Sequence, residues 1–319
     1  MANRPPGITI DRFQQLLREI CDQETSQDPE HWKPENPLWG HCAVASLVAQ
    51  NLFGGDIFRA SMQRRGKVFG SHYWNRLQDG KDYDFTRDQF GGTLPTLLDP
   101  ALRDRASILY PKPDDPDERK QLFVGTRNRY KLLAWRLLQK LYGINAAGRQ
   151  NPLFSDTRYR ACFEVAMDSP CQKMKFGCVI TREGSILYAG SNNTIEPLRS
   201  LCDPTCIRLS IQSRTDSMIG ACGHGEELAL WEVARKGIRL DECELYVAGF
   251  HPTSLPWLKT DGEHTCLRCS VQMFNARLRT IYVPLQAPDT FNTAVWHPLS
   301  AEEALRGAVA YALKEKTIK

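Results

Sequence analysis

The sequence of 319 residues lacks an apolar run of the roughly 18 residues that a membrane-spanning helix needs, so we expect no membrane association. Its first six residues, MANRPP, lack the apolar centre of a secretory signal. The 11 cysteines are an odd number in a long chain, which does not suit a disulfide framework. Because stable disulfides belong to oxidising compartments, these absences predict a cytoplasmic protein.

An excess of one charge is also missing. Residues 1–150 hold 22 basic and 18 acidic residues, whereas residues 151–319 hold 19 of each. A protein that grips a nucleic-acid backbone normally carries a basic patch, so the neutral second half favours a small-molecule substrate. The most basic run, residues 119–140, has seven Lys or Arg and no acid. It predicts an amphipathic helix with a solvated face, and contact with nucleic acid or an acidic partner is the alternative.

The length indicates two domains of ordinary size. Three prolines in residues 111–116 mark the clearest break in the pattern of helices and strands. We therefore predict a first domain over residues 1–115, a linking basic helix over residues 116–152 and a second domain over residues 153–319. The first domain should be of the α+β class. The second should be an α/β three-layer sandwich around a mixed sheet.

A histidine and two cysteines in the second domain have the spacing of a catalytic metal site. His224 is followed by Glu226 and, later in the chain, by Cys266 and Cys269. A catalytic zinc keeps three protein ligands and leaves one position for water, and H-x-E followed by C-x-x-C is typical of nucleobase deaminases. Glu226 is placed to take a proton from water and return it to the leaving amine. The C-x-x-C pair alone would equally suit a structural zinc or a redox motif.

The residues around this pattern predict a regular alternation of helices and strands. Helices are expected over residues 226–234 and 269–276, and strands over residues 244–248 and 280–283. Each half of the zinc site would then open a helix, and each helix would lead to a strand. Residues 286–298 read as a loop, and residues 301–313 as a final helix that packs on the sheet.

Residues 158–285 resemble the cytidine and deoxycytidylate deaminase superfamily, whose opening hairpin is similar to residues 175–192 here. The resemblance implies a zinc-dependent hydrolase of carbon–nitrogen bonds, a fold of cytidine deaminase type, a homo-oligomer and a nucleoside or nucleotide substrate. It also implies that Asn192 contacts the sugar of that substrate. Three departures indicate a divergent member, or one with a different amino-bearing ring as substrate: Gly225 replaces the usual Ala, Thr265 replaces the usual Pro, and the segment over residues 250–264 is long.

Three further cysteines form a second cluster in the sequence near the zinc motif. Cys202, Cys206 and Cys222 could hold a structural metal, completed by Cys171 or His264. Free cysteine is also a common buried residue, so the alternative is a set of small core side chains.

The first domain carries a candidate thiol site. Cys42 falls where a loop runs into an apolar helix, and a helix start favours the thiolate. His72 lies on a predicted strand at residues 71–75, and Asp84 lies on the predicted return strand at residues 81–86. An antiparallel pair could bring His72 and Asp84 together as base and orienting carboxylate for a Cys42 nucleophile. The alternative is a buried cysteine and a surface histidine.

Residues 28–100 resemble the YunG-like family, in the runs W-G-x-C-A-V, S-H-Y-W-N-x-L-x-D-G and D-x-T-x-x-Q-F. The resemblance implies a papain- or transglutaminase-like thiol fold with Cys42 as nucleophile, His72 as base and Asp84 as orienter. His41 stands where Gln is more usual, so any oxyanion-binding role of that position would be altered.

Together these patterns predict a zinc-dependent deaminase of a cytosine-type nucleoside or nucleotide, fused to a thiol hydrolase or deamidase. Three alternatives stay open. The chain could deaminate cytosine or adenine in single-stranded nucleic acid, or the thiol domain could be a peptidase or deamidase whose zinc domain only binds a ligand. In the third, the zinc is purely structural.

Overall fold

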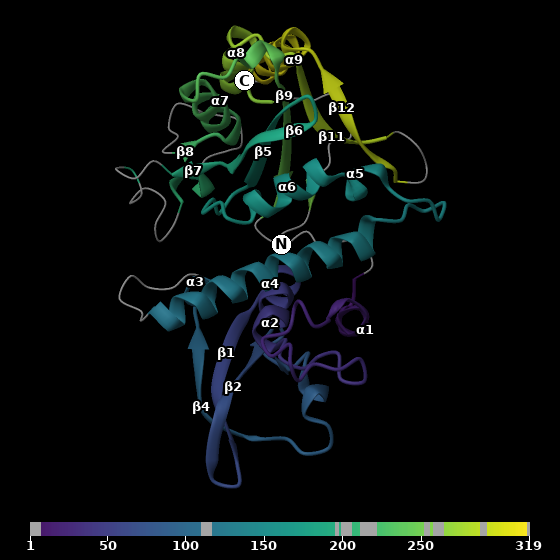
Figure 1. Cartoon of the computed structure of the whole chain (residues 1–319), viewed down its shortest axis with the longest axis vertical. Helices are drawn as coiled ribbons and strands as arrows, with labels where there is room; N and C mark the ends of the chain where they lie inside the picture. Colours follow the sequence, from purple (N-terminus) through teal and green to yellow (C-terminus); the bar gives the residue numbers. More distant parts are fainter. Residues whose placement is uncertain are drawn as a thin grey trace. The chain divides into compact units, whose positions relative to one another are not determined.

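The computed structural model describes residues 8–109, 117–194, 198, 206–210, 222–251, 256–257, 265–287 and 292–317. The chain divides into two compact units, Met1–Leu141 and Tyr142–Lys319, each with its own main sheet (Figure 1). The basic helix, α4 (Asp117–Tyr142), falls almost wholly within the first of these units, and the predicted domain boundaries stay a prediction. None of the helices in the described part combines the length and apolar character needed to span a bilayer.

The first unit packs helices against an antiparallel sheet of strand order β3–β2–β1–β4. The first helix is α1, and its apolar residues Phe13, Leu16, Leu17 and Ile20 are buried. The class is thus α+β, as the sequence predicted. The elements are α1 (Ile10–Ile20), α2 (Cys42–Phe53), β1 (Asp56–Arg64), β2 (Lys67–Arg76), β3 (Asp82–Tyr83), the 3-10 helix η1 (Arg87–Phe90), β4 (Thr96–Arg103), α3 (Arg105–Leu109) and α4.

The return strand expected over residues 81–86 is much shorter than predicted. It covers Asp82–Tyr83 only, because Asp84 turns the chain: its Oδ1 accepts a hydrogen bond of 3.1 Å from the backbone N–H of Thr86. This local turn competes with the sheet ladder, as aspartate side chains often do. Phe85 then points into the core and meets the rings of Phe13 and Phe53.

The second unit is built on a mixed sheet of order β12–β11–β9–β5–β6, in which β11 and β9 are parallel and the other neighbours are antiparallel. The elements of this unit are α5 (Pro152–Ser155), α6 (Thr157–Ala166), β5 (Lys175–Arg182), β6 (Ser185–Ser191), β7 (Asn193–Thr194), η3 (Ile207–Ser210), β8 (Cys222–Gly223), α7 (Gly225–Arg235), η4 (Leu240–Glu242), β9 (Glu244–Phe250), β10 (Pro256–Trp257), α8 (Leu267–Asn275), β11 (Thr280–Gln286), β12 (Ala294–Leu299) and α9 (Ala301–Thr317).

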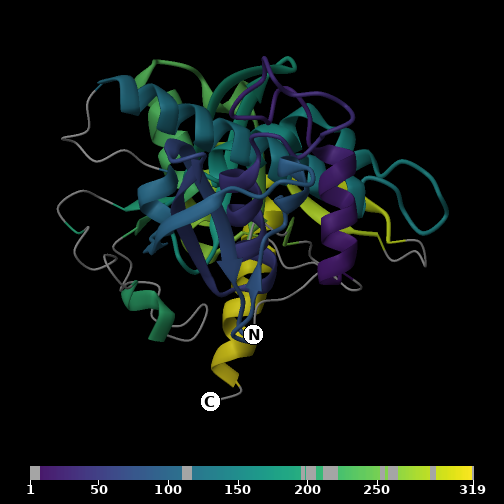
Figure 2. The same ribbon diagram turned by 90° about the horizontal axis from the view of Figure 1, so that it is seen from below.

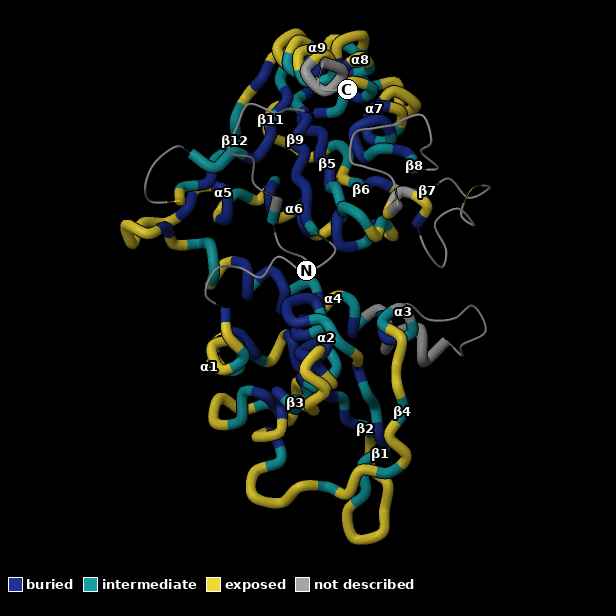
Figure 3. Tube along the Cα trace, turned by 180° about the vertical axis from the view of Figure 1, so that it is seen from behind, coloured by how far each residue is buried: buried dark blue, intermediate teal, exposed yellow. Residues whose placement is uncertain are grey.

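Helices cover both faces of this sheet, which gives the three layers that the sequence predicted. Neighbouring residues of β5 show the two sides: a Cβ on Gly177 would lie 1.8 Å from the carbonyl oxygen of Cys162 in α6, whereas the Cys178 thiol packs under α7. On the α6 face, Phe163 and Phe250 meet edge to face. On the other face lie α7, α8 and α9, the last in yellow in Figure 2. The central strands β5 and β9 are accordingly buried (Figure 3).

The prediction of a loop over residues 286–298 was wrong in its second half. Residues Ala294–Leu299 form β12, which pairs antiparallel with β11. Pro298 lies opposite Tyr282 in this pairing. A proline cannot donate to a sheet ladder, yet β12 is an edge strand of the sheet, where that loss is tolerated.

Candidate functional site

The histidine and two cysteines of the zinc motif converge in the second unit. His224 precedes α7 as its N-cap residue, and Cys266 does the same for α8, with Cys269 in the first turn. His224 Nδ1 lies 3.3 Å from the Sγ atom of Cys266 and 3.3 Å from that of Cys269. Ligands at zinc-typical bond lengths in a tetrahedron stand about 3.6 Å apart, so this donor set fits zinc.

Cys266 sits in an environment that favours the thiolate form, whereas the hydrogen bond with Cys266, followed by burial, raises the pKa of Cys269. A hydrogen bond with Cys269 lowers the pKa of Cys266 to about 4; burial opposes the shift and the hydrogen bond with His224 supports it. The start of α8 adds the positive end of a helix dipole. Within the described part of the chain, one group of three or more His, Cys, Asp or Glu side chains lies close enough together to hold a metal ion. It consists of His224, Cys266 and Cys269.

Glu226 lies in the first turn of α7, beside this cluster. Its side chain is buried, and that burial, followed by the charge of Cys266, raises the pKa of its carboxyl above the usual range. A carboxyl group whose pKa is raised accepts a proton more readily, as a general base that must later act as an acid requires. The structure thus brings Glu226 together with the three candidate metal ligands.

Glu227, which the motif analysis passed over, joins the two halves of the site. Its side chain is fully buried, and Oε1 accepts hydrogen bonds from Arg268 Nε and from Gln272 Nε2, the latter at 2.6 Å. Its Oε2 accepts from the backbone N–H of His224 at 3.2 Å, in a capping box. One carboxylate thereby fixes α7 against α8 at the level of the ligands. The sequence signal that could have identified Glu227 is the capping-box spacing from residue 224 to residue 227.

Two of the three departures from the deaminase pattern have local reasons. A Cβ on Gly225 would lie 2.8 Å from the Sγ of Cys178 on β5, so this chain has no room for the usual alanine. Thr265 stands where proline is usual, and its hydroxyl lies 2.6 Å from that of Ser270, both buried at the start of α8. Neither departure removes a ligand.

Asn192, the predicted sugar contact, holds the backbone next to the site. Its Oδ1 accepts from the N–H of Phe176 at 2.8 Å and from the hydroxyl of Ser169 at 2.9 Å, and its Nδ2 donates to the carbonyl of Met174 at 3.0 Å. The residue is buried near Gly225, with one amide hydrogen left over. The sugar contact stays a prediction.

The second cysteine cluster lies only partly in the described residues, because Cys202 and His264 fall outside them. Cys206 is buried, and Cys171 and Cys222 are half-buried. Within the described residues these three do not converge on a common metal position.

In the first unit, the predicted thiol, imidazole and carboxylate do come together. Cys42 opens α2, and His72 on β2 presents Nε2 at 2.8 Å from Asp84 Oδ2. Burial of His72 opposes its protonation, yet hydrogen bonds with Asp84 and Cys42 raise its pKa to about 10. Because Asp84 takes Nε2, the buried Nδ1 is the nitrogen left to face the thiol.

A pocket of about 900 Å³ opens over this group. Both Cys42 and His72 contribute to its wall, together with aromatic side chains and two arginines. Its wall includes Asp28, Cys42, Arg59, His72, Tyr73 and Arg103.

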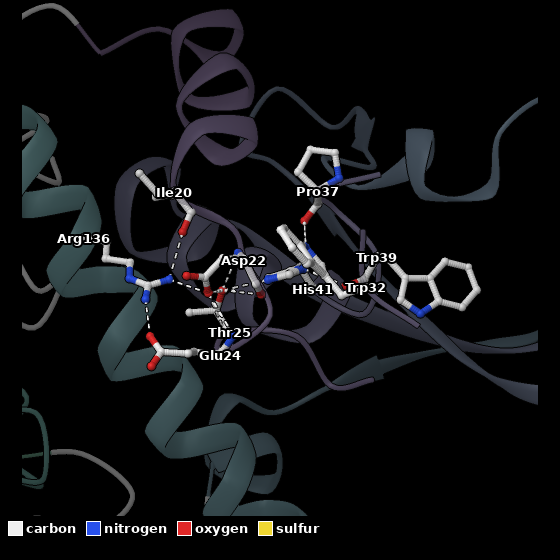
Figure 4. A network of polar contacts seen from close by, with 9 residues as sticks. All are labelled: Ile20, Asp22, Glu24, Thr25, Trp32, Pro37, Trp39, His41 and Arg136. Carbon is white, nitrogen blue, oxygen red and sulfur yellow. Dashed lines mark hydrogen bonds and ion pairs between the residues drawn. The ribbon is translucent and has the colours of Figure 1, made fainter. Parts of the chain in front are cut away.

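His41, the neighbour of the thiol, points into a separate buried network (Figure 4). Its Nε2 lies 2.8 Å from the Thr25 hydroxyl, and its Nδ1 lies 2.8 Å from the Trp39 carbonyl oxygen. Burial lowers the pKa of His41 to about 4, so the ring is neutral at pH 7. Thr25 also bonds with Asp22, which pairs with Arg136 of α4. His41 is therefore a structural link and does not line the pocket.

Comparison with known proteins divides the chain in the same way. A family model described as YunG protein matches residues 9–142. The YunG protein of Bacillus subtilis (strain 168) is 35% identical over 99 residues, which are 31% of this chain and 78% of that protein.

The second unit matches a different family model, the cytidine and deoxycytidylate deaminase zinc-binding region, over residues 155–285. Among solved structures, the apo crystal structure of dCMP deaminase from the cyanophage S-TIM5 is 21% identical, and the match covers 41% of this chain and 82% of that one, with a TM-score of 0.28.

Proposed function

Because the chain belongs to the YunG family in its first unit and carries a cytidine and deoxycytidylate deaminase zinc-binding region in its second, we propose that it deaminates a cytosine-type free nucleoside or nucleotide. The observation that carries the proposal is the convergence of His224, Cys266 and Cys269 beside the buried carboxyl of Glu226. The even charge balance of residues 151–319 supports a small substrate over a nucleic-acid strand.

The chemistry of such a site divides between zinc and the protein. Zinc, held by the three ligands, would lower the pKa of water so that water attacks at neutral pH. Glu226 accepts the proton that water gives up when its oxygen bonds to the amino-bearing ring carbon. The same carboxyl then delivers a proton to the amino group, the carbon–nitrogen bond breaks, and ammonia leaves. Glu227 keeps α7 and α8 in register during these steps.

The test is a panel of cytosine-, adenine- and guanine-containing bases, nucleosides and nucleotides, with single-stranded DNA as a further member. Replacement of an amine by a carbonyl adds about one dalton, which mass spectrometry follows directly. We expect cytosine nucleosides or nucleotides to be converted by the zinc-loaded chain and not by Glu226→Gln. Conversion of the DNA strand alone would favour the nucleic-acid alternative, and conversion of nothing would reject the deaminase.

For the first unit, we propose a thiol hydrolase or deamidase of papain- or transglutaminase-like type. The supporting observation is the order Cys42, His72 and Asp84 at the wall of a pocket. His72 takes the thiol proton as the Cys42 sulfur bonds to an amide carbon. The carbon–nitrogen bond then breaks, the amine leaves with that proton, and water hydrolyses the thioester.

This second activity is tested by the rate at which iodoacetamide alkylates Cys42, read by peptide mass spectrometry. We expect Cys42 to react faster than the other cysteines and to slow in His72→Gln, because the variant lacks the imidazole that takes the thiol proton. Equal rates in the parent and in His72→Gln would reject the thiol site.

A further inference from the structure

Two guanidinium groups share the pocket of the Cys42 thiol. Arg59 lies on β1 and Arg103 on β4, and these strands pair antiparallel. Arg59 on β1 pairs with Ala101 on β4, and Arg103 lies two residues after Ala101 on β4. Residues two apart on a strand project from the same face of a sheet, so the two arginines are diagonal neighbours.

Neither guanidinium is neutralised by the protein. Within the described residues, neither Arg59 nor Arg103 has a carboxylate partner. The Nε of Arg59 is buried without any hydrogen-bond partner, and its guanidinium lies 5.9 Å from the centre of the Tyr73 ring. A buried donor without a partner is unusual in a folded protein and points to a ligand that completes it.

The acidic side chain at this pocket is already engaged. Asp28 lines the wall, but its Oδ1 lies 2.8 Å from His31 Nδ1 and its Oδ2 accepts from Trp39 Nε1 at 3.0 Å. The pocket thus offers two unmatched positive charges beside a thiol. Guanidinium groups bind carboxylate and phosphate in a forked geometry, so these charges select an anion.

We propose that the Cys42 pocket takes an acyl substrate bearing a carboxylate or phosphate, which Arg59 and Arg103 hold while Cys42 attacks its amide carbon. This inference rests on the proposed thiol activity. The sulfur–carbon bond forms as the carbon–nitrogen bond breaks, the amine leaves with the proton that His72 took from the thiol, and water then releases the acid. The arginines take no part in the proton transfer, because they bind only the anionic end.

The test compares two reagents with the same reactive carbon and different charge, iodoacetate and iodoacetamide. With either reagent the Cys42 sulfur bonds to the methylene carbon and iodide leaves. The measured quantity is the rate constant of Cys42 with iodoacetate divided by its rate constant with iodoacetamide. This ratio is normalised to the same ratio for Cys42 in the urea-unfolded chain. We expect a normalised ratio of about ten, because one charge-assisted contact accelerates the reaction of the anionic reagent by that factor. In Arg59→Gln and Arg103→Gln the ratio should fall toward one.

A matched control is Arg87→Gln, since Arg87 is exposed and does not line the pocket. It should keep the parent ratio. Protection of Cys42 from iodoacetamide by succinate would support a carboxylate substrate, and protection by inorganic phosphate would support a phosphate one, provided that Arg59→Gln removes the protection. The rate with iodoacetamide also shows whether each variant retains its folded pocket.

The outcomes separate the two claims. If Cys42 reacts rapidly with iodoacetamide but its normalised ratio is one, the anion inference is overturned and the thiol site stands. If Cys42 reacts with neither reagent faster than in the unfolded chain, the thiol activity fails and the inference fails with it.

Discussion

Gly225 shows how a single residue adapts the zinc motif to this chain. Alanine normally suits the start of a helix better than glycine, because glycine loses more backbone entropy on folding. Here the Sγ of Cys178 would lie 2.8 Å from the added methyl group. The glycine and the cysteine beneath it therefore form a complementary pair.

We predict that Gly225→Ala lowers the free energy of unfolding of the second unit by about 1–3 kcal/mol, as overpacking does. Adding Cys178→Ala removes the crowding sulfur, so the double variant should recover part of that loss. Denaturant unfolding of the parent, both single variants and the double variant gives the coupling. Strictly additive effects would mean that the two side chains do not clash.

His41 is the residue whose titration the structure makes most consequential. Its pKa is about 4 in the folded chain, below the ordinary value of 6.5. The unfolded chain therefore binds more protons between these values, and stability falls as the pH drops from 6.5 toward 4.

In His41→Gln, we expect this acid sensitivity to shrink by up to about 3 kcal/mol at pH 4, as a pKa difference of this size implies. The measurement is the thermal unfolding midpoint of parent and variant at pH 7, 5.5 and 4.5. At each step to lower pH, the unfolding midpoint of the variant should rise relative to that of the parent. Parallel curves would show that His41 is not buried as a neutral ring.

At the scale of elements, one buried carboxylate sets how α7 meets α8. Glu227 on α7 binds Arg268 and Gln272 on α8 and caps the backbone at His224. Groups that orient metal ligands affect metal affinity although they do not touch the metal. We expect Glu227→Gln to weaken zinc binding about 10–100-fold in a chelator competition, whereas Glu232→Gln, whose side chain is 40% exposed and pairs with Arg235, should bind as the parent does. Equal affinities of Glu227→Gln and the parent would refute this role.

The difference between local patterns and contacts among distant elements explains what could be predicted from the sequence. The helices and strands around His224, Cys266 and Cys269 follow local periodicity, and the convergence of these three side chains follows motif spacing, so both were predictable. β12 was missed because its pairing with β11 overrides a proline that reads as a breaker. The contacts of Glu227 lie 41 and 45 residues away, and the juxtaposition of Arg59 with Arg103 depends on the pairing of β1 with β4. No local pattern encodes such contacts.

At the scale of the whole molecule, each compact unit has its own site. Groups that share no partners act additively, so we predict that Cys42→Ala leaves the deamination rate within about twofold of the parent. Glu226→Gln should likewise leave the alkylation rate of Cys42 within about twofold. Assaying both variants in both reactions checks this. A large loss of one activity on mutation of the other site would reveal coupling between the units.

We expect His224, Cys266 and Cys269 to hold a zinc ion with one position left for water. X-ray absorption spectroscopy at the zinc edge, on the full chain, tests this expectation without knowledge of the substrate. We predict one zinc per chain with two sulfur ligands at about 2.3 Å and two nitrogen or oxygen ligands at about 2.0 Å, and one sulfur fewer in Cys266→Ser. A third sulfur ligand in the parent would mean a closed structural site and would rule out a zinc with a position open to water.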